Sequence, residues 1–184
     1  MTELHDCLRL TEQQLEAPFK GLLSRSVLKE LIGTDCTRDI VHTARAGVSG
    51  GKWAHPDLVA VVIERHLSMA GPQLSLVGFE LKTQKGFKAD SFYQAFAYSR
   101  FLHRSYVVVC HEANDEWHWK LPEYQELATS LGVGLIRFNC EKIDKDWKVE
   151  VRARSFAPQP RKVDQFIHER MSSSVEWIKR EMAP

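Results

Sequence analysis

Residues 56–82, PDLVAVVIERHLSMAGPQLSLVGFELK, contain two apolar runs with acidic residues near their outer ends. The apolar, β-branched composition of the first run predicts a buried strand over 57–63. A second strand is predicted over 74–82, and the segment 65–72 between them predicts a turn. Because this connection is short, we expect the two strands to be neighbours in one sheet.

Helix and strand patterns lie on both sides of this pair. Apolar residues at helical spacing predict a helix that starts at about Thr11 and ends at Gly33, with Pro18 and Gly21 as places where it bends or divides. The other expected helices are 90–103, 122–131 (ended by Gly132) and 163–180, and the other expected strands are 37–46, 106–110, 133–138 and 147–152.

The order α-β-β-β-α-β-α-β predicts an α/β fold, in which a mixed sheet has helices on its faces. A length of 184 residues suits one domain over 1–184. Its core is expected at about 10–140, with a C-terminal extension over 141–184 that adds an edge strand and a helix.

Composition sets the broad class of protein. With 43% hydrophobic and 27% charged residues, the chain is expected to be globular and water-soluble rather than collagenous, disordered or coiled-coil. No apolar run approaches the roughly 18 residues of a membrane span. The N-terminus, MTELHDCLRL, has no signal-peptide pattern, and the four cysteines form no C-x-x-C pair. We therefore expect a cytoplasmic protein with free thiols.

Charge is distributed unevenly, although the net charge is only +1. Residues 82–104 contain five basic residues and one acidic residue, whereas residues 112–126 contain five acidic residues and one basic residue. Besides Lys82, the basic residues are Lys85, Lys88, Arg100 and Arg104. We expect these four to bind nucleic-acid phosphates, and a solvated, charged helix face is the alternative interpretation.

The charged residues at the strand ends form the strongest candidate site. Side chains alternate in a strand, so Glu80 and Lys82 project on the same side, and strand pairing would bring Asp57 beside Glu80. Two carboxylates about 4 Å apart repel by about 4 kcal/mol at an effective dielectric constant of 20. A divalent ion such as Mg²⁺ would relieve this repulsion, and the backbone carbonyl of Leu81 would add a further oxygen ligand.

Each of these short motifs also has an ordinary structural explanation. A Glu-x-Lys pair on a strand is often a solvated cross-strand ion pair, and Pro-Asp often starts a turn. The functional interpretation depends on both motifs occurring together at the ends of apolar runs. A third element follows in the helix expected over 90–103, where Gln94 and Tyr98 are four residues apart and therefore share a face. Packing of Tyr98 on the sheet is the alternative. The same helix is expected to pack through Phe92, Ala95, Phe96 and Ser99.

Taken in this order, Pro56-Asp57, Glu80-Leu81-Lys82 and the Gln94-x-x-x-Tyr98 element resemble the PD-(D/E)xK nuclease superfamily over roughly residues 10–140. The resemblance implies a restriction-endonuclease-like fold with an α-β-β-β-α-β core. It also implies an enzyme that uses Mg²⁺ or Mn²⁺ to hydrolyse phosphodiester bonds, most often in DNA, in a restriction or phage-defence context.

The resemblance also implies residue roles. Asp57 and Glu80 would be metal ligands together with the Leu81 carbonyl, and Lys82 would be a water-activating base or a charge stabiliser. Gln94 and Tyr98 would contact the substrate backbone or orient Lys82. Glu12 would be the accessory acid of the first helix. Glu16 is the alternative acid, and Glu12 placed at a helix N-terminus also simply complements the helix dipole.

A second hypothesis is a non-catalytic nucleic-acid-binding or scaffold subunit with the same fold. Cutting both DNA strands with one site per chain favours a homodimer. Because no recognition module is evident in the sequence, we expect a partner protein or DNA structure to supply specificity.

Overall fold

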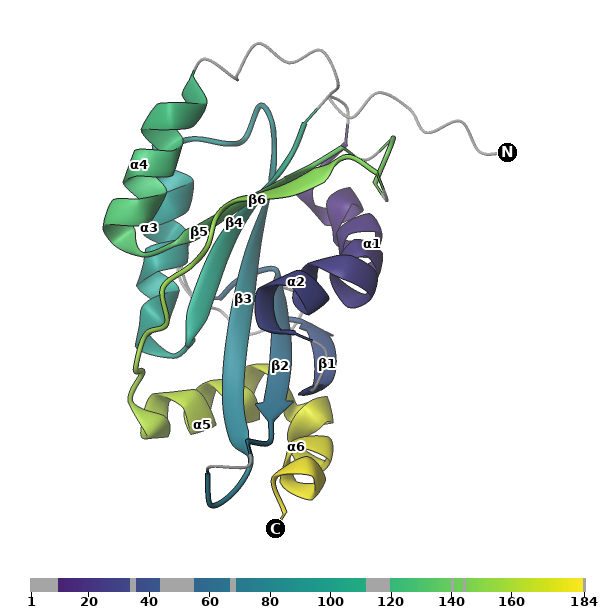
Figure 1. Cartoon of the computed structure of the whole chain (residues 1–184), viewed down its shortest axis with the longest axis vertical. Coiled ribbons are helices and arrows are strands. Elements are labelled where there is room, and N and C mark those ends of the chain that lie inside the picture. The colour runs from purple at the N-terminus through teal and green to yellow at the C-terminus, as the bar shows by residue number, and fades with distance from the viewer. Residues whose placement is uncertain are drawn as a thin grey trace.

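The computed structural model of the protein describes residues 10–33, 36–43, 55–66, 69–111, 120–139, 141–143 and 145–183. At its centre lies a six-stranded mixed sheet in the order β1-β2-β3-β4-β5-β6 (Figure 1). The strands are β1 (Cys36–His42), β2 (Leu58–Glu64), β3 (Gln73–Thr83), β4 (Arg104–Cys110), β5 (Gly134–Phe138) and β6 (Trp147–Val151). The helices are α1 (Glu12–Leu22), α2 (Leu28–Ile32), α3 (Ala89–Ala97), α4 (Leu121–Leu131), α5 (Pro160–Arg170) and α6 (Val175–Met182).

Strand pairing follows the connections between the strands. β1, β2 and β3 pair antiparallel in sequence, and β6 pairs antiparallel with β5. β3, β4 and β5 are parallel. Parallel neighbours need a crossover, which α3 supplies between β3 and β4 and α4 supplies between β4 and β5. The expected α/β class, with helices flanking a mixed sheet, is confirmed.

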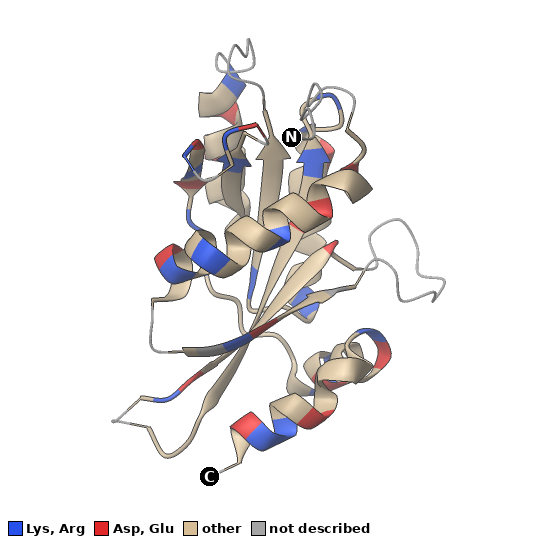
Figure 2. Ribbon diagram, turned by 90° about the vertical axis from the view of Figure 1, so that its right-hand side faces the viewer, with Lys and Arg blue, Asp and Glu red and all other residues tan. Residues whose placement is uncertain are grey.

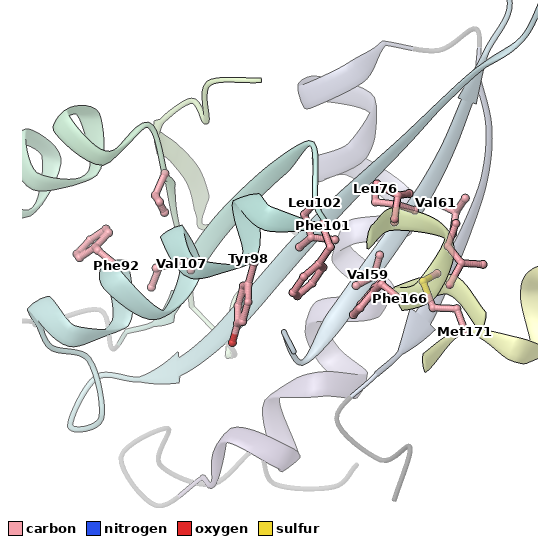
Figure 3. Close-up of a cluster of buried hydrophobic side chains, with 14 of the residues drawn as sticks. Val59, Val61, Leu76, Phe92, Tyr98, Phe101, Leu102, Val107, Phe166 and Met171 are labelled. Carbon is pink, nitrogen blue, oxygen red and sulfur yellow. The ribbon is translucent and has the colours of Figure 1, made fainter. Parts of the chain in front are cut away.

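The sheet separates two hydrophobic cores. On one face, α1, α2 and the turn between them pack on alternate strand residues such as Phe79, Leu81 and Val108. On the other face, α3, α4, α5 and α6 pack on Val59, Leu76 and Val107 (Figures 1 and 3). Both signs of charge are interspersed over the helices, and the strands are largely uncharged (Figure 2). None of the described helices is long and apolar enough to cross a membrane.

The helical segment expected from Thr11 to Gly33 and the helix α4 begin and end where the sequence indicates. Thr11 caps α1 by accepting a hydrogen bond from the Gln14 backbone N–H, and Pro18 lies inside the helix. α1 continues through a π-helical turn at Leu23–Val27 into α2. Gly33 and Gly132 end α2 and α4 with φ angles of 98° and 71°, which favour glycine because it has no Cβ.

The helix expected over 163–180 is two helices. The break falls at Met171, which has φ −132° and ψ 33° and a side chain that is 1% exposed. A 3-10 turn follows, in which the Ser174 hydroxyl donates to Asp39 Oδ2 at 2.8 Å. Packing of Met171 and this contact with β1 stop the helix, and periodicity alone does not report either.

Three further expectations differ from the structure. α3 and the 3-10 turn that follows it pack through Phe92, Ala95 and Tyr98. Phe96 is instead 39% exposed, and its ring contacts that of Phe156. The helix expected to reach residue 103 ends in a 3-10 turn at Tyr98–Arg100. The strand expected over 37–46 ends at His42, and residues 44–46 lie outside the described part of the chain.

Candidate active site

Asp57 lies directly before β2 and is held by β3. Its backbone N–H donates to the Phe79 carbonyl at 3.1 Å, and its side-chain Oδ2 accepts a hydrogen bond from the Leu81 N–H at 2.7 Å. β3 extends beyond the start of β2, so no β2 residue is paired with Leu81. The Asp57 carboxylate therefore takes the place of the missing strand partner.

The Leu81 carbonyl belongs to the same end of the sheet. Residues two apart in a strand direct their backbone groups to the same side, and Phe79 already bonds toward β2 through its carbonyl. The Leu81 carbonyl therefore faces the side on which the Asp57 carboxylate lies. The Asp57 carboxylate and the Leu81 carbonyl oxygen therefore lie on the same side of β3, at the point where β2 begins.

Glu80 is a buried acid with three hydrogen-bond donors. Its side chain projects on the α3 face of the sheet, because successive side chains of a strand alternate and the adjacent residues Phe79 and Leu81 belong to the core on the opposite face. Oε1 accepts from Lys82 Nζ at 2.8 Å and from Gln94 Nε2 at 2.7 Å, and the Tyr98 hydroxyl lies 2.7 Å from Oε2. Glu80 is only 3% exposed, so these donors replace its hydration.

Lys82 joins the strand acids to the first helix. Besides Glu80, its ammonium contacts Glu12 at 3.2 Å. Glu12 is the first residue of α1. Lys82 therefore contacts an acid of the first helix as well as an acid of the sheet. Glu16 lies one turn later and is buried, with 5% exposure.

Gln94 and Tyr98 share a face of α3 and its final turn, as their spacing predicts. Gln94 Nε2 lies 3.0 Å from the Tyr98 hydroxyl, which also lies 2.9 Å from the His55 carbonyl. The Tyr98 ring is fully buried between the helix and the sheet, with its hydroxyl at the edge of the cluster (Figure 3). Tyr98 thus both packs on the sheet and contacts Glu80.

Sequence reasoning missed Thr43, which positions the Pro56-Asp57 segment. Thr43 follows β1 and is fully buried. Its hydroxyl donates to the Pro56 carbonyl, and its N–H donates to the Asp57 carbonyl at 3.1 Å. No sequence signal reveals this role, because it depends on the register between β1 and β2.

Burial and mutual repulsion alter the protonation of these acids. Burial, followed by the negative charge of Glu80, raises the pKa of Asp57 to about 8. Burial also raises the pKa of Glu80, while Lys82 and the Tyr98 hydroxyl oppose that shift. Burial alone would lower the pKa of Lys82, but its contacts with Glu80 and the charges of Glu12 and Asp57 outweigh this effect and raise it. Burial and Glu80 also raise the pKa of Tyr98.

The donor set fits a hard divalent cation. The described residues contain no group of three or more His, Cys, Asp or Glu side chains that could hold a metal ion. They do supply two carboxylates, from Asp57 and Glu80, and the Leu81 carbonyl. Mg²⁺ typically uses one or two protein carboxylates and keeps several waters. Burial raises the pKa of both acids, so an additional cation at this site would favour their ionised forms.

The structure separates the four expected phosphate-binding residues. Lys85 and Lys88 are exposed in the loop that directly follows β3, on the Lys82 side. Arg104 begins β4 opposite Val77, whereas Lys82 pairs with Val109. Five residues along a strand span about 17 Å. Arg104 and Lys82 therefore lie near opposite ends of the β3–β4 pair.

Arg100 belongs to a different surface feature. It lies in the 3-10 turn after α3 and lines a pocket of about 340 Å³ between this turn and α5. Lys162 and Arg170 line the same pocket. Neither residue was predicted from the sequence, although a spacing of eight residues places both on one face of a helix.

No family model matches this chain. No curated protein matches it either. Among solved structures, it is similar to a protein of unknown function from Silicibacter pomeroyi, with 14% identity and a TM-score of 0.44 over 85% of this chain and 86% of that chain. A similarity of this extent assigns neither a fold family nor a function.

Proposed function

We propose that the protein is a divalent-metal-dependent nuclease that hydrolyses phosphodiester bonds of DNA. The observation that supports this most strongly is a pair of hydrogen bonds at the ends of neighbouring strands. Asp57 Oδ2 accepts from the Leu81 N–H, and Lys82 Nζ donates to Glu80. A buried site with two acids whose pKa values are raised, and with an adjacent ammonium group, is suited to binding a cation and a phosphate together.

Asp57, Glu80 and the Leu81 carbonyl would hold Mg²⁺ or Mn²⁺. When bound, such an ion supplies a Lewis acid and a water molecule of lowered pKa. Glu80 is oriented for this role by Gln94 and Tyr98, which donate to its two oxygens. Gln94 and Tyr98 are therefore positioning residues in this proposal.

Lys82 acts as a cation rather than as a base. Its pKa is raised by the surrounding acids, so the side chain is an ammonium group at neutral pH. In that form it donates hydrogen bonds and stabilises the negative charge that develops on the phosphate oxygens. Glu12 also contacts the Lys82 ammonium, at 3.2 Å, and would limit its motion.

The proposal includes the restriction-endonuclease-like fold and the restriction or phage-defence context. The α-β-β-β-α-β order of α1 through β4 and the position of the acids at the start of β2 and near the end of β3 support the fold. The biological context, a homodimer and a specificity-giving partner protein depend on the sequence resemblance and on symmetry alone.

One observation favours the non-catalytic alternative. The Glu80 oxygens already have three hydrogen-bond contacts from Lys82, Gln94 and Tyr98. A carboxylate with donors on both oxygens is satisfied without a metal ion, as a purely structural acid would be. A DNA-binding or scaffold subunit is therefore the second candidate.

Incubation of the purified full chain with supercoiled plasmid tests the two candidates. We expect cutting with Mg²⁺ or Mn²⁺, none in EDTA, and none by Asp57→Asn. Glu126→Gln, a change at an exposed position on α4, is the matched control and should cut normally. Absence of cutting and of calorimetric Mg²⁺ binding, together with retained DNA binding, would favour the scaffold.

A further inference from the structure

A basic pocket lies on the same face of the sheet as Glu80, between the turn that follows α3 and the helix α5. It has a volume of about 340 Å³. Its charged lining comprises Arg100, Lys162, Arg170 and Glu169, and Phe101 and Phe166 also line it. Three cations and one carboxylate give this basic pocket a positive formal charge.

The aromatic residues form the floor of the basic pocket. Phe101 and Phe166 are each 6% exposed, and their rings stack with centroids 4.4 Å apart (Figure 3). Arg100 lies over the Phe101 ring at 5.3 Å from its centroid. Because the rings stack on each other and are buried, they do not offer a platform on which a base could stack. The accessible chemistry is that of the cationic rim.

The basic pocket is connected to the candidate active site through a few direct contacts. Tyr98, whose hydroxyl lies 2.7 Å from Glu80, has its ring 5.9 Å from that of Phe101. Burial lowers the pKa of His55, and the charge of Arg170 lowers it further, so Arg170 lies within electrostatic range of His55. The His55 carbonyl in turn contacts the Tyr98 hydroxyl. Two adjacent aromatic side chains, Tyr98 and Phe101, therefore separate Glu80 from the basic pocket.

We propose that the basic pocket binds a backbone phosphate of the DNA, away from the bond that is cut. This inference rests on the proposed function for the identity of the ligand. Backbone phosphates suit the pocket because guanidinium and ammonium groups bind them without reading base sequence. The contact would position the DNA, and specificity would come from elsewhere.

Fluorescence anisotropy of a labelled DNA duplex, titrated with the full chain in EDTA, tests the inference without cutting. Lys162→Gln removes an exposed cation of the basic pocket, and Lys29→Gln removes an exposed cation of α2 on the opposite face of the sheet. Each lost phosphate contact should reduce the slope of log affinity against log salt by about 0.9. The triple variant Arg100→Gln, Lys162→Gln, Arg170→Gln should bind at least about tenfold more weakly at 50 mM salt.

Several outcomes would overturn the inference. One is an equal salt slope for Lys162→Gln, Lys29→Gln and the unsubstituted protein. Another is the absence of DNA binding by the unsubstituted protein. Calorimetry with inorganic phosphate and with a mononucleotide separates the sources of phosphate. If either binds the basic pocket while the pocket variants keep the DNA affinity of the unsubstituted protein, the pocket is a site for a free anion and the inference is overturned. Lys162→Gln alone suffices if the triple variant fails to fold.

The two proposals fail in different ways. Normal DNA affinity of the pocket variants, with metal-dependent cutting intact, removes only the role of the basic pocket. Loss of affinity in Lys162→Gln, with no cutting by the unsubstituted protein under any metal condition, removes only the nuclease.

Discussion

The Asp57 carboxylate accepts a hydrogen bond from the Leu81 backbone N–H at 2.7 Å, across the point where β2 begins and β3 continues. This contact orders the acid by means of the backbone of the neighbouring strand. It also places the acid close enough to Glu80 for the two negative charges to repel. Both the protonation of the site and its proposed affinity for a cation follow from this arrangement.

The first prediction concerns stability without metal. The folded-state pKa of Asp57 is raised from 3.8 to about 8, so the stability associated with its protonated form is lost as pH rises through this window. Asp57→Asn removes this titration and should be less pH-sensitive. We expect urea denaturation in EDTA to show the variant gaining stability relative to the unsubstituted protein between pH 5 and pH 9. If the difference in free energy of unfolding between the variant and the unsubstituted protein is the same at pH 5 and at pH 9, the raised pKa of Asp57 is contradicted.

Metal binding should release a proton. Acids bind a cation in their deprotonated form, and at pH 7 the Asp57 carboxyl is mostly protonated. We expect about one proton per Mg²⁺, and an apparent affinity that rises about tenfold per pH unit from pH 6 to 7.5. Calorimetry in two buffers of different ionisation enthalpy measures the release. Absence of proton release at pH 7 would count against Asp57 as a ligand.

Lys82→Ala should separate metal binding from catalysis. The ammonium group competes with a metal ion for the two acids, so its loss should tighten Mg²⁺ binding at pH 9, where Asp57 is ionised. Loss of its positive charge should reduce cutting by at least about 100-fold. Calorimetry and plasmid cleavage measure the two effects, with Lys29→Ala on α2 as the control. Unchanged cutting would remove Lys82 from the proposed chemistry.

The Tyr98 hydroxyl should stabilise both the fold and the charged form of Glu80. Tyr98→Phe leaves a buried carboxylate oxygen without this partner, and we expect a cost of about 1–3 kcal/mol in the free energy of unfolding. Tyr93→Phe is the matched control, because Tyr93 lies on α3 and is 46% exposed, and its effect should be within about 0.5 kcal/mol.

Loss of the Tyr98 hydroxyl also raises the pKa of Glu80, since this contact lowers it. The pH at which cutting reaches half of its maximum should therefore increase in Tyr98→Phe. A change in stability without any change in the pH profile would show that Tyr98 has a structural role only.

Gly78 allows the segment before Asp57 to pack closely on β3. A Cβ at this position would lie 2.2 Å from Leu102 Cδ1 and 3.2 Å from Pro56 Cγ. We expect Gly78→Ala to cost about 1–3 kcal/mol through overpacking and to weaken Mg²⁺ binding by shifting Asp57. Gly71→Ala is the control, because no atom lies within 4 Å of the added Cβ. Equal free energies of unfolding for Gly78→Ala and Gly71→Ala in urea denaturation would contradict this account.

Local patterns predicted most of the fold. The apolar run of β2, the glycines that end α2 and α4, and the spacing of Gln94 and Tyr98 all depend on residues close in sequence. The split between α5 and α6 was not predicted, because it depends on the packing of Met171 and on the contact from Ser174 to Asp39 on another element. The separation of Arg104 from Lys82 depends on the register of two parallel strands.

By itself, the sequence determined the α/β class, the order of the elements and the presence of charged residues near two strand ends. Hydrophobic periodicity and turn residues encode these features locally. Only the tertiary structure decided that Asp57 bonds to a backbone group 24 residues away and that Glu12 meets Lys82 across 70 residues. Such contacts form because sheet register and helix packing bring distant groups together, and no local pattern specifies that geometry.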